Sequence, residues 1–208
     1  MPDITEVLRS LWGVWRLLLL DRRGIQAFDG TRATGLRSFW VALLLLPILA
    51  LGTTVLVASG IESAALAVVE ALAGITVAWL LPLLVMYGVV KWYGRGERYW
   101  LLLTALNWSQ VPQELLGLLR IGLLVAAVSL IGGPDAVPDR TSTTFLVAAL
   151  MANLERVIYY AAIFYEGFIA WNALESGLAL PIAVTLLDAV ITEGISYGID
   201  QFLPTLTT

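Results

Sequence analysis

The chain contains neither cysteine nor histidine among its 208 residues. Without thiols it can form no disulfide bond and offers no thiolate nucleophile. Without imidazole it lacks a Ser-His-Asp triad, histidine-ligated haem and the usual zinc sites. No phosphate-binding glycine loop is present to support another chemistry. We therefore predict no catalytic residue, no metal site and no cofactor, and we expect a protein that is not an enzyme.

Charged residues are also scarce. They make up 13% of the chain, against roughly 25% in soluble domains. Hydrophobic residues make up 59%, and the mean hydropathy is +0.86. A soluble domain could not hide so much apolar surface from water, so lipid is expected to contact much of the molecule. The net charge of −4 gives nucleic acid no electrostatic footprint, so we expect no nucleic-acid partner.

The apolar residues occur in long blocks separated by short polar segments. This pattern predicts an all-α fold: a polytopic membrane helix bundle of about five transmembrane helices with an N-terminal amphipathic interfacial helix. A helix needs about 20 predominantly apolar residues to cross a bilayer. We assign residues 1–38 to a cytoplasmic amphipathic helix and basic hinge, and residues 39–203 to the transmembrane domain. The predicted spans cover about 39–58, 65–90, 113–131, 145–171 and 180–203.

Residues 3–20 have the residue spacing of an amphipathic helix. Asp3 can accept hydrogen bonds from its first amide groups, and Glu6 follows three residues later. With Trp12 and Trp15 on this helix, a position in the membrane interface is one interpretation, and packing on the cytoplasmic mouth of the bundle is the other. The acidic start is not typical of a cleavable signal, so we expect the whole chain to be retained.

Pro112 interrupts the apolar block that precedes the third span. Proline has no backbone N–H and disfavours a helix interior. The residues before it include the polar Asn107, Ser109 and Gln110. We therefore predict a short surface or partly re-entrant helix over 99–111, a break at Pro112, and then the span itself.

The distribution of basic residues predicts the topology. Six of the twelve precede residue 39, and Lys91, Arg95 and Arg98 lie between the second and third spans. Arg140 lies in a loop on the opposite side. Because basic residues are enriched in cytoplasmic loops, we expect a cytoplasmic N-terminus and, with an odd number of spans, a periplasmic C-terminus. The predicted location is the bacterial inner (cytoplasmic) membrane, with several passes.

Ionisable side chains within the predicted spans form the candidate functional site. An unpaired charge near the bilayer centre costs at least ~2.5 kcal/mol, so each should face protein or water. We predict an intramembrane polar seam made by Arg120, Glu155, Arg156, Glu166, Asp188 and Glu193. Depth along the helices, at about 1.5 Å per residue, matches Asp188 to Arg120 and Glu193 to Arg156.

Two interpretations of this seam remain open. In the first, the charged groups lock the last three spans together. In the second, the surplus carboxylates Glu155, Glu166 and Glu193 line a water-filled path as proton or cation sites, because six carboxylates lie within the spans against two cations.

Several short motifs resemble those of a known family. The stretches Asp21-Arg22-Arg23-Gly24, Phe28-Asp29, Arg37-Ser38-Phe39-Trp40 and Asn107-Trp108-Ser109-Gln110 are similar to stretches of uncharacterised bacterial inner-membrane proteins, especially alphaproteobacterial ones. The layout of an amphipathic start and five close spans resembles the Yip1 family of small membrane proteins. The Asp-Leu-Tyr-Gly-Pro type sequence of its eukaryotic members is absent. The resemblance implies a five-span fold and a non-enzymatic role.

These observations favour a non-enzymatic membrane protein that organises or binds other membrane components. The amphipathic helix, through Trp12 and Trp15, and the basic hinge, through Arg22 and Arg23, would contact the lipid surface. Membrane lipids are the expected partners, together with other membrane proteins or further copies of the chain. The alternative is a small proton-coupled transporter or channel that uses the intramembrane carboxylates.

Overall fold

The computed structural model of the chain describes residues 1–61, 63–64, 68, 72, 77, 79–133 and 141–202, with the backbone alone at 196 and 199–202. Within these residues the secondary structure is helical and contains no strand, so the predicted all-α fold is confirmed. The elements are α1 (Ile4–Leu18), η1 (Arg22–Ala27), α2 (Arg32–Arg37), η2 (Ser38–Trp40), α3 (Val41–Ala58), α5 (Leu80–Trp92), η4 (Gly96–Arg98), α6 (Tyr99–Leu130), α7 (Thr143–Leu174) and α8 (Ala179–Phe202).

Three helical segments in the described part of the chain are long and apolar enough to cross a membrane. They are Arg32–Ala58, Gly96–Leu130 and Thr143–Leu174, with 27, 35 and 32 residues. At about 1.5 Å per residue, each exceeds the ~30 Å thickness of the hydrocarbon core. The predicted second span, 65–90, falls partly outside the described residues, and its described end belongs to the shorter apolar helix Leu80–Trp92.

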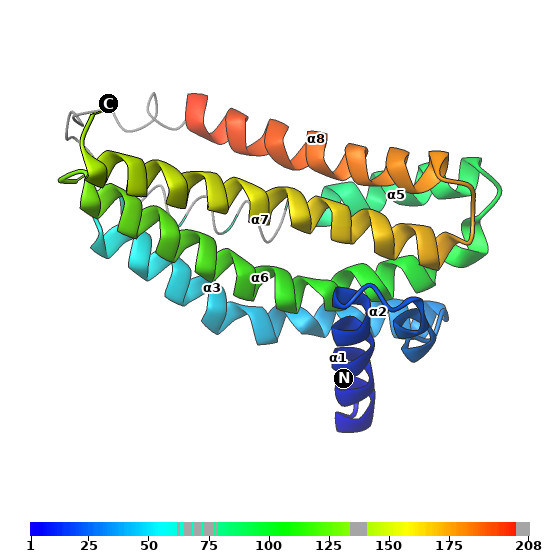
Figure 1. Ribbon diagram of the computed structural model, residues 1–208. Coiled ribbons are helices and arrows are strands. Elements are labelled where there is room, and N and C mark those ends of the chain that lie inside the picture. The colour runs from blue at the N-terminus through cyan, green and yellow to red at the C-terminus, as the bar shows by residue number, and fades with distance from the viewer. Residues whose placement is uncertain are drawn as a thin grey trace.

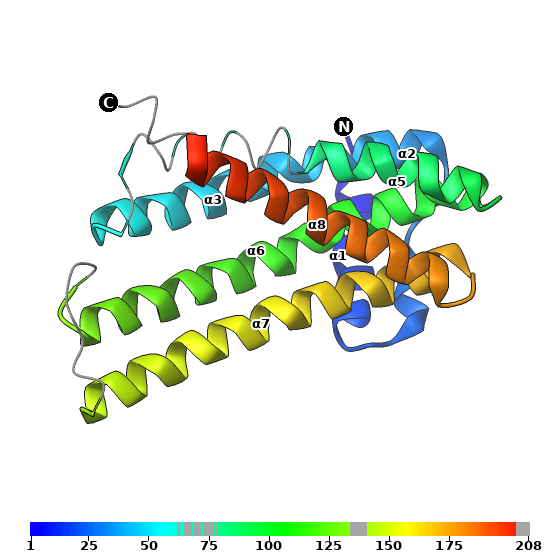
Figure 2. The same ribbon diagram turned by 90° about the horizontal axis from the view of Figure 1, so that it is seen from above.

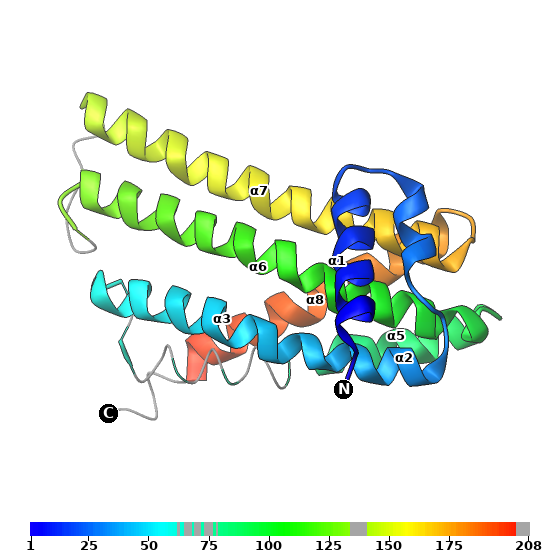
Figure 3. The same ribbon diagram turned by 90° about the horizontal axis from the view of Figure 1, so that it is seen from below.

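The long helices lie lengthwise beside one another, and α1 crosses them (Figures 1 and 3). α6 packs along α7, and α3 packs along α6. α8 runs obliquely over the bundle and contacts both α7 and α5 (Figure 2). The N-terminal elements α1, η1 and α2 gather around the end of the bundle where α7 ends and α8 begins.

The expected break at Pro112 is wrong. α6 runs through Pro112 as one helix of 32 residues. Proline removes only one backbone hydrogen bond, and in a membrane helix the freed groups can be satisfied by neighbouring side chains and helices. Residues Leu102 to Ser109, which precede Pro112, are all buried in the bundle. The free energy gained by burying them exceeds the free energy lost with one backbone hydrogen bond. Tertiary packing therefore outweighs the local preference for a break.

Burial is concentrated at the end of the bundle that α1 covers. Nearly all buried residues of α6 lie between Tyr99 and Ser109, and those of α7 lie mostly between Tyr165 and Leu174. We call this region the packed half: α1, η1, α2, residues 99–109 of α6 and residues 165–174 of α7. The remainder, residues 110–130 of α6 and 143–164 of α7, is the open half. Only Ala127 and Ala148 are buried on those two segments.

The amphipathic N-terminal helix is present as predicted. Asp3 caps it, accepting a hydrogen bond of 2.6 Å from the amide of Glu6. Two glycines let its backbone approach η1: a Cβ on Gly24 would lie 2.5 Å from the carbonyl oxygen of Gly13. Arg37 of α2 binds the carboxylate of Glu6 at 3.2 Å. The helix is therefore fixed to the bundle, and the segment predicted as a hinge is largely helical.

Candidate functional site

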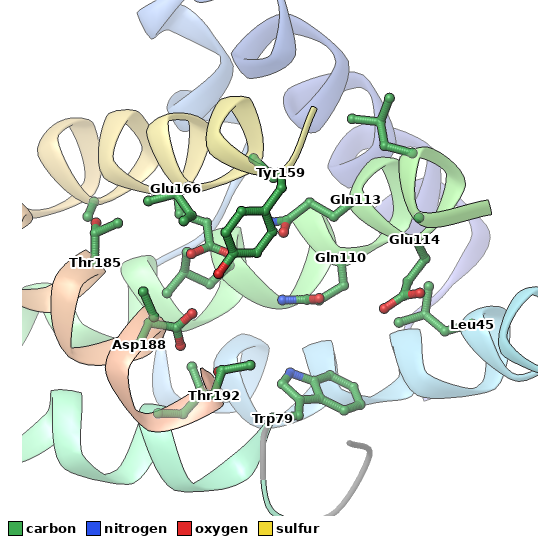
Figure 4. A pocket seen from close by; sticks show the side chains of 18 of the residues that line it. Leu45, Trp79, Gln110, Gln113, Glu114, Tyr159, Glu166, Thr185, Asp188 and Thr192 are labelled. Carbon is green, nitrogen blue, oxygen red and sulfur yellow. The ribbon is translucent and has the colours of Figure 1, made fainter. Parts of the chain in front are cut away.

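A cavity of about 430 Å³ lies between α3, α5, α6, α7 and α8, and Trp79 also lines it. The lining consists of apolar side chains and of several polar side chains, which come from three helices, α6, α7 and α8 (Figure 4). The polar lining residues with hydroxyl, amide or charged groups are Gln110, Gln113, Glu114, Arg120, Tyr159, Glu166, Thr185, Asp188 and Thr192. Concave, mostly apolar pockets with a few convergent polar groups are the usual form of small-molecule sites.

Two carboxyl groups face each other in this cavity. Glu166 of α7 and Asp188 of α8 are both half-buried and interact directly through their side chains. The side chain of Gln113 reaches Glu166 from α6, and Gln110 points from the same helix toward Asp188 (Figure 4). Two adjacent carboxylates in a poorly solvated site repel each other, and a shared proton or a bound cation relieves that repulsion.

The single cation of the cavity lining is engaged elsewhere. Arg120 donates from Nε to Oε1 of Glu155 at 2.8 Å. Its guanidinium also lies 5.0 Å from the ring centre of Tyr159. The hydroxyl of Tyr159 in turn donates a hydrogen bond to Glu193 of α8. These contacts join α6, α7 and α8 within the open half, where few apolar side chains are buried.

The six predicted seam residues thus divide by their contacts into two groups, with one residue in neither group. Arg120, Glu155 and Glu193 belong to the network around Tyr159, whereas Glu166 and Asp188 form the carboxyl pair of the cavity. The depth-matched pairing of Arg120 with Asp188 is wrong, because Arg120 binds Glu155 on the neighbouring helix. Axial depth alone ignores the direction of each side chain around its helix, and that direction decides the partner.

Arg156 is the exception. Its side chain is exposed on the outer surface of α7 and forms no ion pair with any residue that the structure describes. The predicted pairing of Arg156 with Glu193 is therefore not found, and Glu193 binds Tyr159 instead. Glu70, another carboxylate of the predicted spans, lies outside the described residues.

Two cavity residues, Gln110 and Gln113, were missed by sequence reasoning. They occupy one face of α6 with Gly117 and Arg120, at the spacing of three and four residues that aligns side chains along a helix. The assumed break at Pro112 separated them from Arg120 and concealed this face. A continuous helical pattern through residues 110–120 was the signal that could have identified them.

A buried polar cluster beside the packed half connects Ser38 and Asn107, which are far apart in the sequence. Asn107 is completely buried; it donates to the hydroxyl of Ser38 at 2.7 Å and accepts from Trp79 Nε1 at 3.1 Å. Trp108 beside it is 1% exposed. Buried polar groups need such partners to offset the loss of hydration. Ser38 and Asn107 therefore have a structural role where η2, α6 and the start of α5 meet.

The predicted lipid-surface residues all lie around α1 and η1. Trp12 and Trp15 are 58% and 54% exposed on α1. Arg22 lies 4.3 Å from the ring centre of Trp171, at the end of α7. Arg23 is exposed, and its amide donates to Asp21. That bond and the neighbouring Arg16 lower the pKa of Asp21 below its ordinary value.

Comparison with protein-family models, curated proteins and solved structures gives no match. Within the described ranges, no group of three or more acidic side chains is arranged to hold a metal ion. The site is therefore defined by its own geometry: a carboxyl-containing cavity within the bundle, and an exposed amphipathic helix across its end.

Proposed function

We propose that the chain is a non-enzymatic, multi-pass protein of the bacterial inner membrane that organises membrane components by binding the lipid surface through α1. We further propose a Yip1-like arrangement of about five spans, with a cytoplasmic N-terminus and a periplasmic C-terminus. The observation that carries this proposal is the division of α1 into three faces. Each face has a different surrounding.

The first face of α1, with Ser10, Gly13, Val14 and Leu17, is buried against the bundle. The second face is apolar and uncovered. Its side chains are between 54% and 71% exposed: Ile4, Leu8, Trp12, Trp15 and Leu19. The third face carries Thr5 and Arg9, which are exposed to solvent. A helix that is fixed to protein, apolar on one open side and polar on the other fits a membrane–water interface.

The position of α1 along the bundle agrees with this placement. The hydroxyl of Tyr165 donates to the carbonyl oxygen of Val14 at 3.3 Å, so α1 crosses α7 at residue 165. From there to its start at Thr143, α7 extends for about 33 Å at about 1.5 Å per residue. That length matches the ~30 Å hydrocarbon core. If α1 lies in the interface, the open half therefore lies within the hydrocarbon core, beside the lipid tails.

Basic side chains at the level of α1 would attract anionic head groups. Arg16 and Arg37 are neutralised by Asp21 and Glu6. Arg9, Arg22 and Arg23 have no acidic partner in the part of the chain that the structure describes. Near an anionic surface each basic residue contributes about 1 kcal/mol of attraction. These three arginines are the proposed lipid contacts.

Single cysteines provide the test, because the natural chain has none. Leu8→Cys on the apolar face and Arg9→Cys on the polar face would each carry an environment-sensitive dye in liposomes with brominated lipids. The proposal expects strong quenching at position 8 and weak quenching at position 9. Arg22→Gln with Arg23→Gln should lower the enrichment of anionic lipids around the purified protein, whereas Arg98→Gln should not. Equal quenching at positions 8 and 9 would contradict the interfacial position.

The cavity supports a second candidate function, a small proton-coupled transporter or channel. The specific observation is the carboxyl pair of Glu166 and Asp188 inside a cavity of about 430 Å³. In this mechanism a proton or a small cation would occupy the space between them. Proteoliposomes should then show proton or cation flux that Glu166→Gln and Asp188→Asn abolish, while Glu175→Gln outside the cavity leaves it unchanged. Lack of flux from the unmodified protein would exclude this function.

A further inference from the structure

The outer surface of α7 carries polar side chains in the middle of the open half. Asn153, Arg156 and Tyr160 are exposed there, among the exposed apolar residues Leu150, Leu154 and Val157. Asn153 satisfies its amide within the helix, donating to the carbonyl oxygen of Ala149 at 2.7 Å. Arg156 has no comparable contact with the residues that the structure describes. The position is therefore unusual for a surface that faces lipid.

The depth of Arg156 makes this exposure costly. It lies about 13 Å along α7 from Tyr165, where α1 crosses, and about 20 Å from Thr143 at the other end. An arginine near a helix end can extend its charge to the interface, but one this far from both ends cannot do so easily. A charged guanidinium at such a depth needs an anion from protein.

A suitable anion lies on the adjoining helix. Glu193 is exposed on α8, and its carboxylate accepts a hydrogen bond from Tyr159, less than one turn along α7 from Arg156. Arg120, the cation that lies over the ring of Tyr159, is already paired with Glu155. Among the residues that the structure describes, Glu193 has no cationic partner. One unmatched cation and one unmatched anion thus lie on neighbouring outer surfaces of α7 and α8.

We propose that a second copy of the chain docks on this α7–α8 surface. In a two-fold symmetric dimer, Arg156 would bind Glu193 of the partner subunit, and Glu193 would receive the reciprocal contact. Charge complementarity between identical surfaces selects this occupant, because the same patch supplies both signs. Gly194 follows Glu193 on α8 and is exposed, and its lack of a side chain would allow the helices to approach closely. This inference goes beyond the lipid-binding function, and it rests on the proposed interfacial position of α1 for the depth of Arg156.

Charge reversal distinguishes this dimer from an ion pair formed within one chain. Arg156→Glu alone and Glu193→Arg alone place like charges across the interface, so each should lower dimer recovery by about tenfold or more. Co-expression of the two variants with different tags restores both ion pairs only between unlike chains. We therefore expect recovery of the mixed dimer. In membranes, Val157→Cys in each background would report the same result as cross-linked dimer.

Two further variants keep the test decisive if a reversed charge prevents folding. Arg156→Leu suits lipid and should fold, while its cross-linked dimer is lost. Lys91→Glu changes the same charge at the far end of α5 and should leave the dimer intact. The proposal is overturned if Val157→Cys in the otherwise natural chain gives no cross-link in membranes, or if adding Arg156→Leu to Val157→Cys leaves the cross-link unchanged. A double variant that carries both Arg156→Glu and Glu193→Arg tests for an ion pair within one chain. Such a pair is indicated if this double variant restores stability while the two co-expressed single variants form no mixed dimer.

Discussion

The packed half and the open half of the bundle are stabilised by different interactions. In the packed half, Leu17, Leu102, Ile169 and Leu174 are completely buried, as in a soluble core. In the open half, the described segments of α6 and α7 bury few apolar side chains, and polar contacts such as Arg120 with Glu155 and Tyr159 with Glu193 join the helices. Burial of apolar groups is favourable only relative to water, and between helices in lipid that driving force is absent. The two halves therefore differ because the packed half is proposed to contact water and the open half to contact lipid.

The largest expected effect lies in the packed half. Trp108→Ala would remove a side chain that is 1% exposed and leave a large cavity. The expected loss is about 3–5 kcal/mol of unfolding free energy. Leu150→Ala, at a position 69% exposed on α7, is the matched change in the open half and should alter stability by less than about 0.5 kcal/mol. Unfolding titrations in mixed micelles would measure both, and similar losses would remove the distinction between the halves.

A smaller effect is expected where α1 meets η1. A Cβ at Gly24 would lie 2.5 Å from the carbonyl oxygen of Gly13 and 2.8 Å from Cγ of Leu17. Gly24→Ala should therefore displace α1 and cost about 1–3 kcal/mol. Gly88→Ala is a suitable control, because nothing lies within 4 Å of its added Cβ. Protease sensitivity of the N-terminal segment should rise for Gly24→Ala only. An unchanged digestion pattern would show that α1 is not closely packed.

The ion pair of the open half should be weaker than the contacts of the packed half. A double-mutant cycle with Arg120→Met and Glu155→Gln isolates its coupling energy. Polar contacts between membrane helices contribute about 0.6 kcal/mol on average and up to about 1.7 kcal/mol. We expect a coupling in this range from unfolding titrations. A coupling near zero would mean that polar contacts do not hold α6 to α7.

The smallest expected effect is a pH dependence at the edge of the packed half. The amide of Arg23 and the guanidinium of Arg16 lower the pKa of Asp21 from its ordinary value of 3.8. A lowered pKa stabilises the folded state above the unfolded value, and this contribution is lost as pH falls through the folded value. The natural chain should therefore lose stability below about pH 4, and Asp21→Asn should lose less over the same interval. Identical pH profiles would contradict this role for Asp21.

Local patterns allowed several parts of the fold to be predicted. The cap at Asp3, the amphipathic helix α1 and the long helices α7 and α8 follow from side-chain spacing and length. The continuity of α6 could not be predicted in this way, because the burial that outweighs Pro112 comes from distant segments. The same limit applied to Arg120, whose partner is set by the rotation of two helices about their axes.

The amino-acid sequence by itself determined the solvent preference of this protein: long apolar blocks and few charges produce helices that are long and apolar enough for lipid. It also determined which ionisable groups lie among them. Only the tertiary structure decided how those groups combine, with Glu166 facing Asp188 in a cavity and Arg156 left exposed. Hydrophobicity acts on each residue separately, whereas an ion pair or a cavity requires two helices to meet at a particular angle and register.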